Sequence, residues 1–357
     1  MGYAPPYRRL VVYHTISSML LANRRSMPKH TRTLGNTLAC DDDAVSTEPP
    51  GNTPAPLVLR GQTFDAARPA VMAIVNRTTD SFYVGNRHAD LDSALAALDS
   101  AVALGADIVD IGGVRAGQEG EAVTPGMEID RVMPFLERAR AAYPDLILSL
   151  DTWRSEVARA AAHAGVDLVN DTWAGYDPDL LATAVEIGAG YVISHTGGYP
   201  PRTDPVDVTY GPGELDVVDD VVSTLRSGAV RAVAAGMPRE RVLVDPTLDF
   251  GKTTTHSLRV LRHTEAVTAL GFPVLQALSR KDFVGETLDL PADERLEGSL
   301  AATAVAAWLG ATVFRAHDVG ATRRVVDMVA SIRGDRPPLV SVRGIGPHSR
   351  PADGATP

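Results

Sequence analysis

Short apolar runs alternate with longer amphipathic segments over most of this chain. Eight runs rich in β-branched residues have the length of buried strands; they span Val71–Asn76, Asp107–Gly112, Leu146–Thr152, Leu168–Asp171, Tyr191–His195, Arg241–Pro246, Pro273–Ser279 and Thr312–Asp318. Between them, apolar residues recur at helical spacing, as at Leu95, Leu98 and Val102, and a glycine such as Gly105 often ends the segment. Eight strands alternating with helices predict a closed parallel (β/α)8 barrel, the TIM-barrel fold.

An open doubly wound sheet is the alternative fold, because it also alternates strands and helices. No glycine-rich dinucleotide-binding motif follows the first predicted strand. The sequence therefore favours the barrel.

The texture of the chain changes near residue 69. From about residue 28 onward it is rich in Thr, Pro, Asn and Asp without a sustained period, so residues 1–68 are expected to be a disordered leader, or to begin upstream of the true initiator. Residues 69–335 form the predicted single barrel domain. The Pro-, Arg- and Gly-rich residues 336–357 form the predicted flexible tail.

Composition excludes several classes of protein. The net charge of -10 is spread along the chain, which makes nucleic acid a poor partner. The single cysteine, Cys40, excludes a disulfide framework and fits a cytoplasmic location. No apolar run approaches the roughly 20 residues that span a membrane, and His14 interrupts the one stretch that resembles a secretory signal.

Polar residues collect at the carboxyl ends of the predicted strands, although polar side chains are costly in strands buried on both faces. They are Asn76, Asp151, Asn170, Asp171, His195, Asp245, Ser279, Arg280, Lys281, Arg315, His317 and Asp318. The active site of a barrel of this type lies at this face. For Asp171, Thr152 and Asp318 a simple turn or helix-capping role is favoured, whereas the whole set predicts a functional cluster.

The residue types indicate the ligand. Asp151, Asn170 and Asp245 offer acceptors and an amide, which suit the edge of a guanine-like or pterin ring. Lys281, Arg315 and His317 supply donors and positive charge for a ring carbonyl or a phosphate-bearing group.

These residues lie in motifs that resemble those of dihydropteroate synthases, over roughly Pro69 to Gly334. The matching segments are Ile74–Phe82, Asp107–Gly113, Ser149–Thr152, Val169–Asp171, Val244–Pro246, Phe250–Lys252, Ser279–Lys281 and Arg315–Asp318. The resemblance implies a transferase that joins 6-hydroxymethyl-7,8-dihydropterin diphosphate to para-aminobenzoate and releases diphosphate. It also implies a homodimer.

The resemblance assigns roles residue by residue. Asp151, Asn170, Asp245 and Lys281 would bind the pterin, and Asn76, Arg315 and His317 the diphosphate, with Mg²⁺ near Asn76. Phe250 and Lys281 would shape the aminobenzoate slot. Asp245, Lys281, Arg315 and His317 would be the catalytic residues.

Two departures concern the second substrate. The family's Gly-Gly-Glu-Ser-Thr-Arg-Pro loop is replaced after Gly113, where only a displaced Arg115 offers a substitute. The family's Asp-Pro-Gly-x-Gly-Phe becomes Asp245–Phe250, in which Thr247 and Asp249 replace glycines, and the Asp249 charge would repel a carboxylate.

Three functions therefore stay open. One is a working synthase, the second is a catalytically inactive pterin-binding paralogue, and the third is a pterin-using barrel enzyme with another acceptor, such as a methyltransferase. The basic residues Lys281, Arg315 and His317 argue against a methyltransferase, because they suit a diphosphate.

Overall fold

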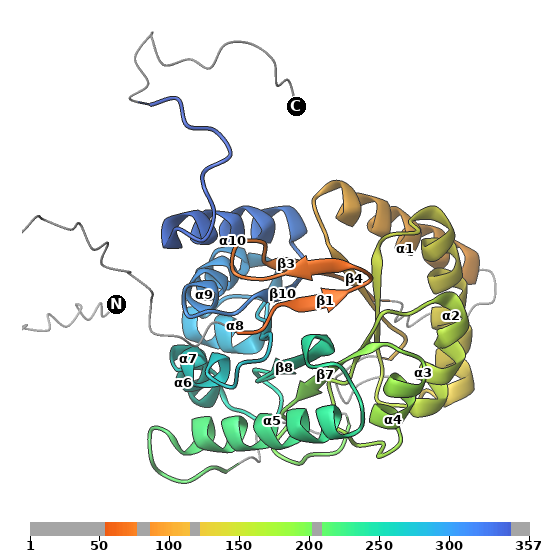
Figure 1. Cartoon of the computed structure of the whole chain (residues 1–357), viewed down its shortest axis with the longest axis horizontal. Helices are drawn as coiled ribbons and strands as arrows, with labels where there is room; N and C mark the ends of the chain where they lie inside the picture. The colour runs from red at the N-terminus through yellow and green to blue at the C-terminus, as the bar shows by residue number, and fades with distance from the viewer. Residues whose placement is uncertain (1–53, 77–85, 115–121, 202–208, 344–357) are drawn as a thin grey trace, which may run out of the picture. The chain divides into compact units, whose positions relative to one another are not determined.

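Eight parallel strands form a closed barrel in the computed structural model, which describes residues 54–76, 86–114, 122–201 and 209–343 (Figure 1). The strands are β3 (Ala70–Asn76), β4 (Ile108–Gly112), β5 (Ile147–Asp151), β6 (Leu168–Asn170), β7 (Gly190–Ser194), β8 (Val242–Asp245), β9 (Leu275–Ala277) and β10 (Val313–Ala316). They are ordered β8-β7-β6-β5-β4-β3-β10-β9, and a parallel bridge between Val244 and Val274 joins the two ends. The predicted barrel is confirmed.

Helices follow the strands and cover the outside of the barrel. They are α1 (Asn86–Ala103), α2 (Pro125–Ala142), α3 (Ser155–Ala161), α4 (Leu180–Glu186), α5 (Asp216–Ala234), α6 (Thr254–Arg262), α7 (Thr264–Thr268), α8 (Asp282–Leu288), α9 (Leu296–Trp308) and α10 (Val319–Arg333). The predicted tail after α10 is without helix or strand as far as residue 343.

The side chains of each barrel strand alternate between two cores, as the period of a strand requires. On β7, Tyr191 and Ile193 join the outer cluster beneath the helices, whereas Val192 joins the cluster inside the barrel. The interior cluster also contains Met72, Ile108 and other apolar residues from the early part of each strand. Positions two residues further on in each strand therefore point inward as well.

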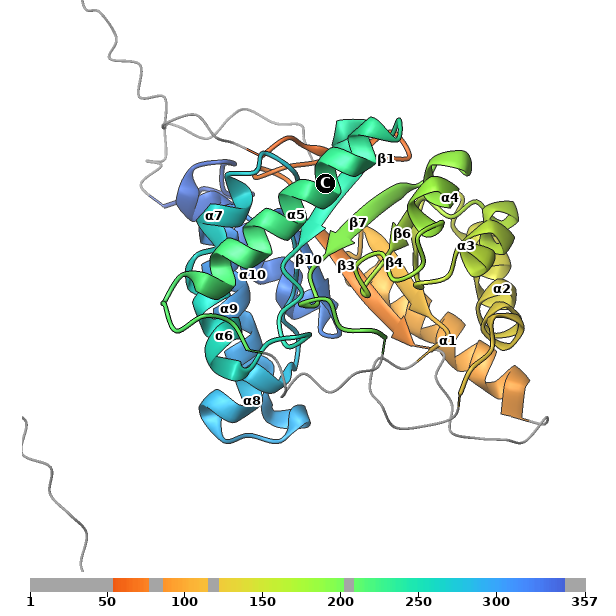
Figure 2. The same cartoon turned by 90° about the horizontal axis from the view of Figure 1, so that it is seen from below.

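A hairpin closes the amino-terminal end of the barrel. β1 (Leu57–Leu59) and β2 (Gln62–Phe64) pair antiparallel, and Leu57, Leu59 and Phe64 belong to the interior cluster. Figure 2 shows β1 at the opposite end of the barrel from α8. Gly190 is required here, because a Cβ at this residue would lie 2.9 Å from Leu59 and 2.8 Å from the Arg241 carbonyl.

The hairpin corrects the expectation that the leader runs to residue 68. Its strands are only three residues long, too short for a period to show in the sequence. Residues 1–53, the remainder of the predicted leader, lie outside the described residues, as do residues 344–357 of the predicted tail.

Candidate functional site

A ring of polar side chains lies inside the barrel at the carboxyl ends of its strands. Its members stand two or four residues beyond the apolar interior positions, and so point inward; they are Asp110, Ser149, Asp151, Asn170, Ser194, Asp245 and Arg315. Five of them, Asp110, Ser149, Asn170, Ser194 and Asp245, are at most 5% exposed. The structure thus brings the sequence-predicted Asp151, Asn170, Asp245 and Arg315 together.

Arg315 connects two carboxylates across this ring. Its Nε donates to Asp110 Oδ2 at 2.6 Å and its Nη2 donates to Asp151 Oδ2 at 2.9 Å. Asp110 also accepts hydrogen bonds from Ser149 Oγ at 2.5 Å and Asn170 Nδ2 at 3.0 Å. The guanidinium therefore lies among the residues expected to hold the pterin ring, and a ligand that uses Asp151 Oδ2 has to compete with it.

Asp110 was missed by the sequence reasoning, although it left a signal. A carboxylate between Val109 and Ile111, in the middle of a fully buried strand, is costly unless a charge or several donors satisfy it. Three donors do so here.

Burial governs the electrostatics of the ring. It raises the pKa of Asp151 to about 7, with Asp110 adding to the rise and Arg315 opposing it. Burial also raises the pKa of Asp245, against the charge of Lys281. A bound ring with N–H donors would lower the pKa of both carboxyls, because it would hydrogen-bond to their charged forms.

The loop between β8 and α6 keeps a left-handed backbone at the two positions where the family has glycine. Thr247 has a φ of 50° and Asp249 a φ of 72°. Thr247 Oγ1 donates to the Asp245 carbonyl at 2.9 Å and accepts from the His195 N–H at 3.2 Å. Hydrogen bonds of this kind offset a strain of roughly 1 kcal/mol per residue.

An aromatic wall borders the predicted acceptor slot. Phe250 lies 5.3 Å from Trp173 edge to face, and Trp173 lies 6.5 Å from Trp153. Lys281 Nζ lies 5.0 Å from the centre of the Phe250 ring and donates to the Leu248 carbonyl. Phe250 and Lys281, predicted to shape one slot, are thus in contact.

A buried lysine lies beneath this loop, and the sequence analysis assigned it no role of its own. Lys252 is 2% exposed, and its Nζ lies 2.8 Å from His195 Nδ1 and 2.9 to 3.2 Å from the carbonyl oxygens of His195, Thr247 and Phe250. Burial lowers the pKa of Lys252 to about 7 and that of His195 to about 4. Lys252 joins the end of β7 to the β8–α6 loop.

Ser194 contributes a hydroxyl that no described residue bonds. It is 2% exposed, and its Cα pairs in register with that of Asp245. A buried hydroxyl without a partner costs about 1–3 kcal/mol, so a ligand in the ring has an unused group to bond.

The remaining predicted residues lie at the rim or serve turns. His317 is exposed, and its ring Nδ1 lies 3.1 Å from Ser279 Oγ. Asn76 ends β3, but its side chain lies outside the described residues, as does Arg115. The turn roles expected for Asp171 and Thr152 are confirmed, since they accept from the Trp173 and Gly175 N–H groups and from the Arg154 N–H respectively. The expectation for Asp318 is wrong, because it makes no side-chain capping bond to α10 and instead pairs with the Arg280 guanidinium.

The described residues give the Mg²⁺ prediction no ready-made cage. Within them, no group of three or more His, Cys, Asp or Glu side chains is placed to hold a metal ion. Mg²⁺ that binds substrate phosphates needs only one or two protein ligands. The Mg²⁺ ion near Asn76 therefore stays a prediction.

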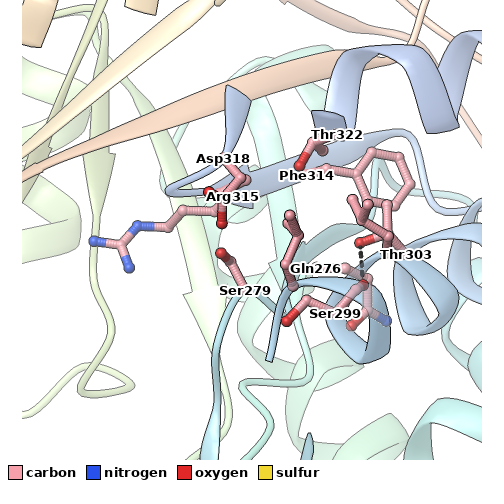
Figure 3. Close-up of a pocket in the computed structure, with 11 residues that line it drawn as sticks. Gln276, Ser279, Ser299, Thr303, Phe314, Arg315, Asp318 and Thr322 are labelled. Carbon is pink, nitrogen blue, oxygen red and sulfur yellow. Dashed lines mark hydrogen bonds between the residues drawn. The ribbon is translucent and has the colours of Figure 1, made fainter. Parts of the chain in front are cut away.

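A separate pocket lies outside the barrel wall. Figure 3 shows Gln276, Ser299, Thr303 and Thr322 around it, while the Arg315 guanidinium points away from them. These residues come from β9, α9 and α10, and Arg315 of the polar ring also contributes to the lining.

Comparisons with known proteins agree with this geometry. The family model described as pterin binding enzyme matches residues 72–317. A Mycobacterium leprae protein named inactive dihydropteroate synthase 2 is 55% identical over 288 residues, which are 81% of this chain and 99% of that protein. Haemophilus influenzae dihydropteroate synthase is 35% identical over 74% of this chain and 94% of its own length.

A solved structure supports the same assignment. Xanthomonas albilineans dihydropteroate synthase with 4-aminobenzoic acid superposes with a TM-score of 0.69 at 35% identity, over 79% of this chain and 99% of that one.

In the described part of the chain, no helix has the length and apolar character of a membrane span.

Proposed function

Because the chain belongs to the pterin-binding enzyme family, as a protein of the dihydropteroate synthase type, we propose that its polar ring binds 6-hydroxymethyl-7,8-dihydropterin diphosphate. The observation that carries this proposal is the convergence of Asp151, Asn170 and Asp245 on the barrel interior. Their acceptors and amide match a ring edge that presents several N–H donors and a carbonyl. Lys281, in the loop between β9 and α8, adds a donor at the same end of the barrel.

The diphosphate is assigned to the rim. His317 is exposed at the rim. The Arg315 guanidinium would reach the diphosphate once a bound pterin replaces it as the partner of the Asp151 carboxylate. Asn76 is the protein ligand proposed for a Mg²⁺ ion that accompanies the diphosphate. Bound Mg²⁺ would neutralise charge on the leaving diphosphate.

The acceptor half supports a protein that holds the pterin without condensing it with para-aminobenzoate. Thr247 and Asp249 stand in the β8–α6 loop where the family has glycines, and the family's second-loop motif is absent. The 55% identity with a protein named inactive dihydropteroate synthase 2 is in accord with this candidate.

Condensation with para-aminobenzoate is the second candidate, favoured by a different observation. The basic groups Lys281, Arg315 and His317 are all retained, and a protein that never releases diphosphate has less need of them. In this candidate the diphosphate leaves, and Asp245 stabilises the pterin cation that the aromatic amine captures.

Calorimetry and product analysis on one sample test both candidates. The pterin diphosphate is titrated into the protein in the presence of Mg²⁺. Para-aminobenzoate is then added, and the dihydropteroate and diphosphate that form are measured. We expect Asp245→Asn to weaken pterin binding at least about tenfold, or ~1.4 kcal/mol. The control is Asp107→Asn, which alters a largely buried carboxyl just before β4, at the opposite end of the barrel. Absence of pterin binding by the wild-type protein would refute the proposal.

A homodimer is proposed through α9 and α10. Trp308, Met328 and Ile332 on these helices are 55 to 60% exposed, and large exposed apolar side chains suit a protein contact. Light scattering of the purified chain measures the oligomeric state, and a monomer would refute this point. Cytoplasmic location stays a prediction, which fractionation of expressing cells tests.

A further inference from the structure

The β8–α6 loop places a carboxylate beside the acceptor slot. Asp249 directly precedes Phe250, and its left-handed backbone turns its side chain toward α8. A glycine would adopt this φ without strain. The aspartate side chain therefore has to make contacts that offset the strain.

Those contacts are with the first turn of α8. Asp249 Oδ2 accepts from the Asp282 N–H at 2.7 Å, and Oδ1 accepts from the Phe283 N–H at 3.2 Å. Lys281, the N-cap residue of this helix, makes no side-chain capping bond. Asp249 thus caps α8 from a loop that is distant in the sequence. The N–H groups of Asp282 and Phe283 are therefore already bonded and are not free to bind a ligand in the slot.

The described basic groups around the slot already have partners. Lys281 is shared between the Leu248 carbonyl and the Phe250 ring. Nearby, Arg280 pairs with Asp318, and Arg295 pairs with Asp282. Asp245 and Asp249 both act on Lys281 electrostatically, so two acids border one lysine.

We propose that Asp249 is a specificity-determining residue, which excludes aromatic amines that carry a carboxylate and leaves the slot to uncharged or cationic aromatic amines. The inference rests on the proposed function, because the roles of Phe250 and Lys281 define the slot. An uncharged amine keeps the ring contact with Phe250. A carboxylated amine meets the Asp249 charge in a partly buried place, where repulsion is stronger than in water.

The test compares 4-aminobenzoate with 4-aminobenzamide, which has the same ring and amine but no charge. The full chain is first saturated with 6-hydroxymethylpterin, which has no leaving group, in the presence of Mg²⁺ and inorganic diphosphate. Each amine is then titrated by calorimetry. We expect the wild-type protein to bind the amide at least about tenfold more tightly, and Asp249→Asn to reduce this preference to about threefold or less.

Asp289→Asn is the matched control. Asp289 also has a left-handed backbone, with a φ of 55°, and lies exposed at the other end of α8. It should leave the tenfold preference unchanged. If Asp249→Asn does not fold, the wild-type preference decides alone.

Three outcomes would overturn the inference while pterin binding is intact: equal or tighter binding of 4-aminobenzoate, an unchanged preference in Asp249→Asn, and binding of neither amine. Failure of the pterin to bind in the first titration would instead refute the proposed function, and the slot with it.

Discussion

Removal of the Asp110 carboxylate should destabilise the barrel and weaken pterin binding together. In Asp110→Ala, Ser149, Asn170 and Arg315 lose a shared acceptor inside a fully buried strand. Breaking one side of a buried ion pair costs about 3–5 kcal/mol. Because Arg315 keeps Asp151 at 2.9 Å, we expect the lower end, ~3 kcal/mol, or a fall in Tm of about 6–12 °C.

The isosteric Asp110→Asn separates the charge from the hydrogen bonds. Its amide oxygen can accept from Asn170 and Arg315 while its NH₂ donates to Ser149, so only about 1–2 kcal/mol should be lost. Urea unfolding and thermal melting measure both variants. The control is Asp99→Ala, which removes an exposed acceptor of the Tyr143 hydroxyl.

The reasoning would be refuted if Asp110→Ala lost no more stability than Asp99→Ala. It would also be refuted if Asp110→Ala and Arg315→Met were additive in a double-mutant cycle, because residues in one ion pair must show a coupling energy.

Three further predictions concern the interior. Burial lowers the pKa of Lys252 to about 7 in the folded state, whereas an unfolded lysine has a pKa of about 10.4, so the free energy of unfolding should rise as the pH increases from about 7 to about 10.4. Urea unfolding should show this rise for the wild-type protein relative to Lys252→Met. Equal dependence of stability on pH in the two proteins would contradict the prediction. Ser194→Ala should stabilise the free protein by about 1–3 kcal/mol, because it removes a buried hydroxyl without a partner, and it should weaken pterin binding. The control is Thr312→Val, which removes another such hydroxyl just before β10 and should not affect binding. Phe64→Ala should cost about 3–5 kcal/mol through loss of the hairpin's buried ring, and a change under 1 kcal/mol would exclude a sealing role.

The barrel was predictable because its signal is repeated eight times. Each strand run and each helix-ending glycine is weak alone, but all point to one fold. The same repetition placed Asp151, Asn170, Asp245 and Arg315 at one face. The partners of Arg315 were not predictable, because they depend on rotamers inside the barrel.

Asp249 shows why sequence charge alone is an incomplete guide. The replacement of glycine by aspartate indicated repulsion of a carboxylate, but it did not reveal that the side chain also caps α8. The capping partner lies more than thirty residues away in the chain. Only the fold brings the two segments together.

The hairpin at the amino-terminal end of the barrel also has a consequence for synthesis. Leu57, Leu59 and Phe64 pack against interior residues as late in the chain as Val313. On a ribosome the hairpin emerges before any barrel strand, and its apolar face has no finished surface to dock on until the last barrel strand has been made. A two-stranded hairpin is marginal on its own, so this segment should be the part of the nascent protein that most needs protection from aggregation.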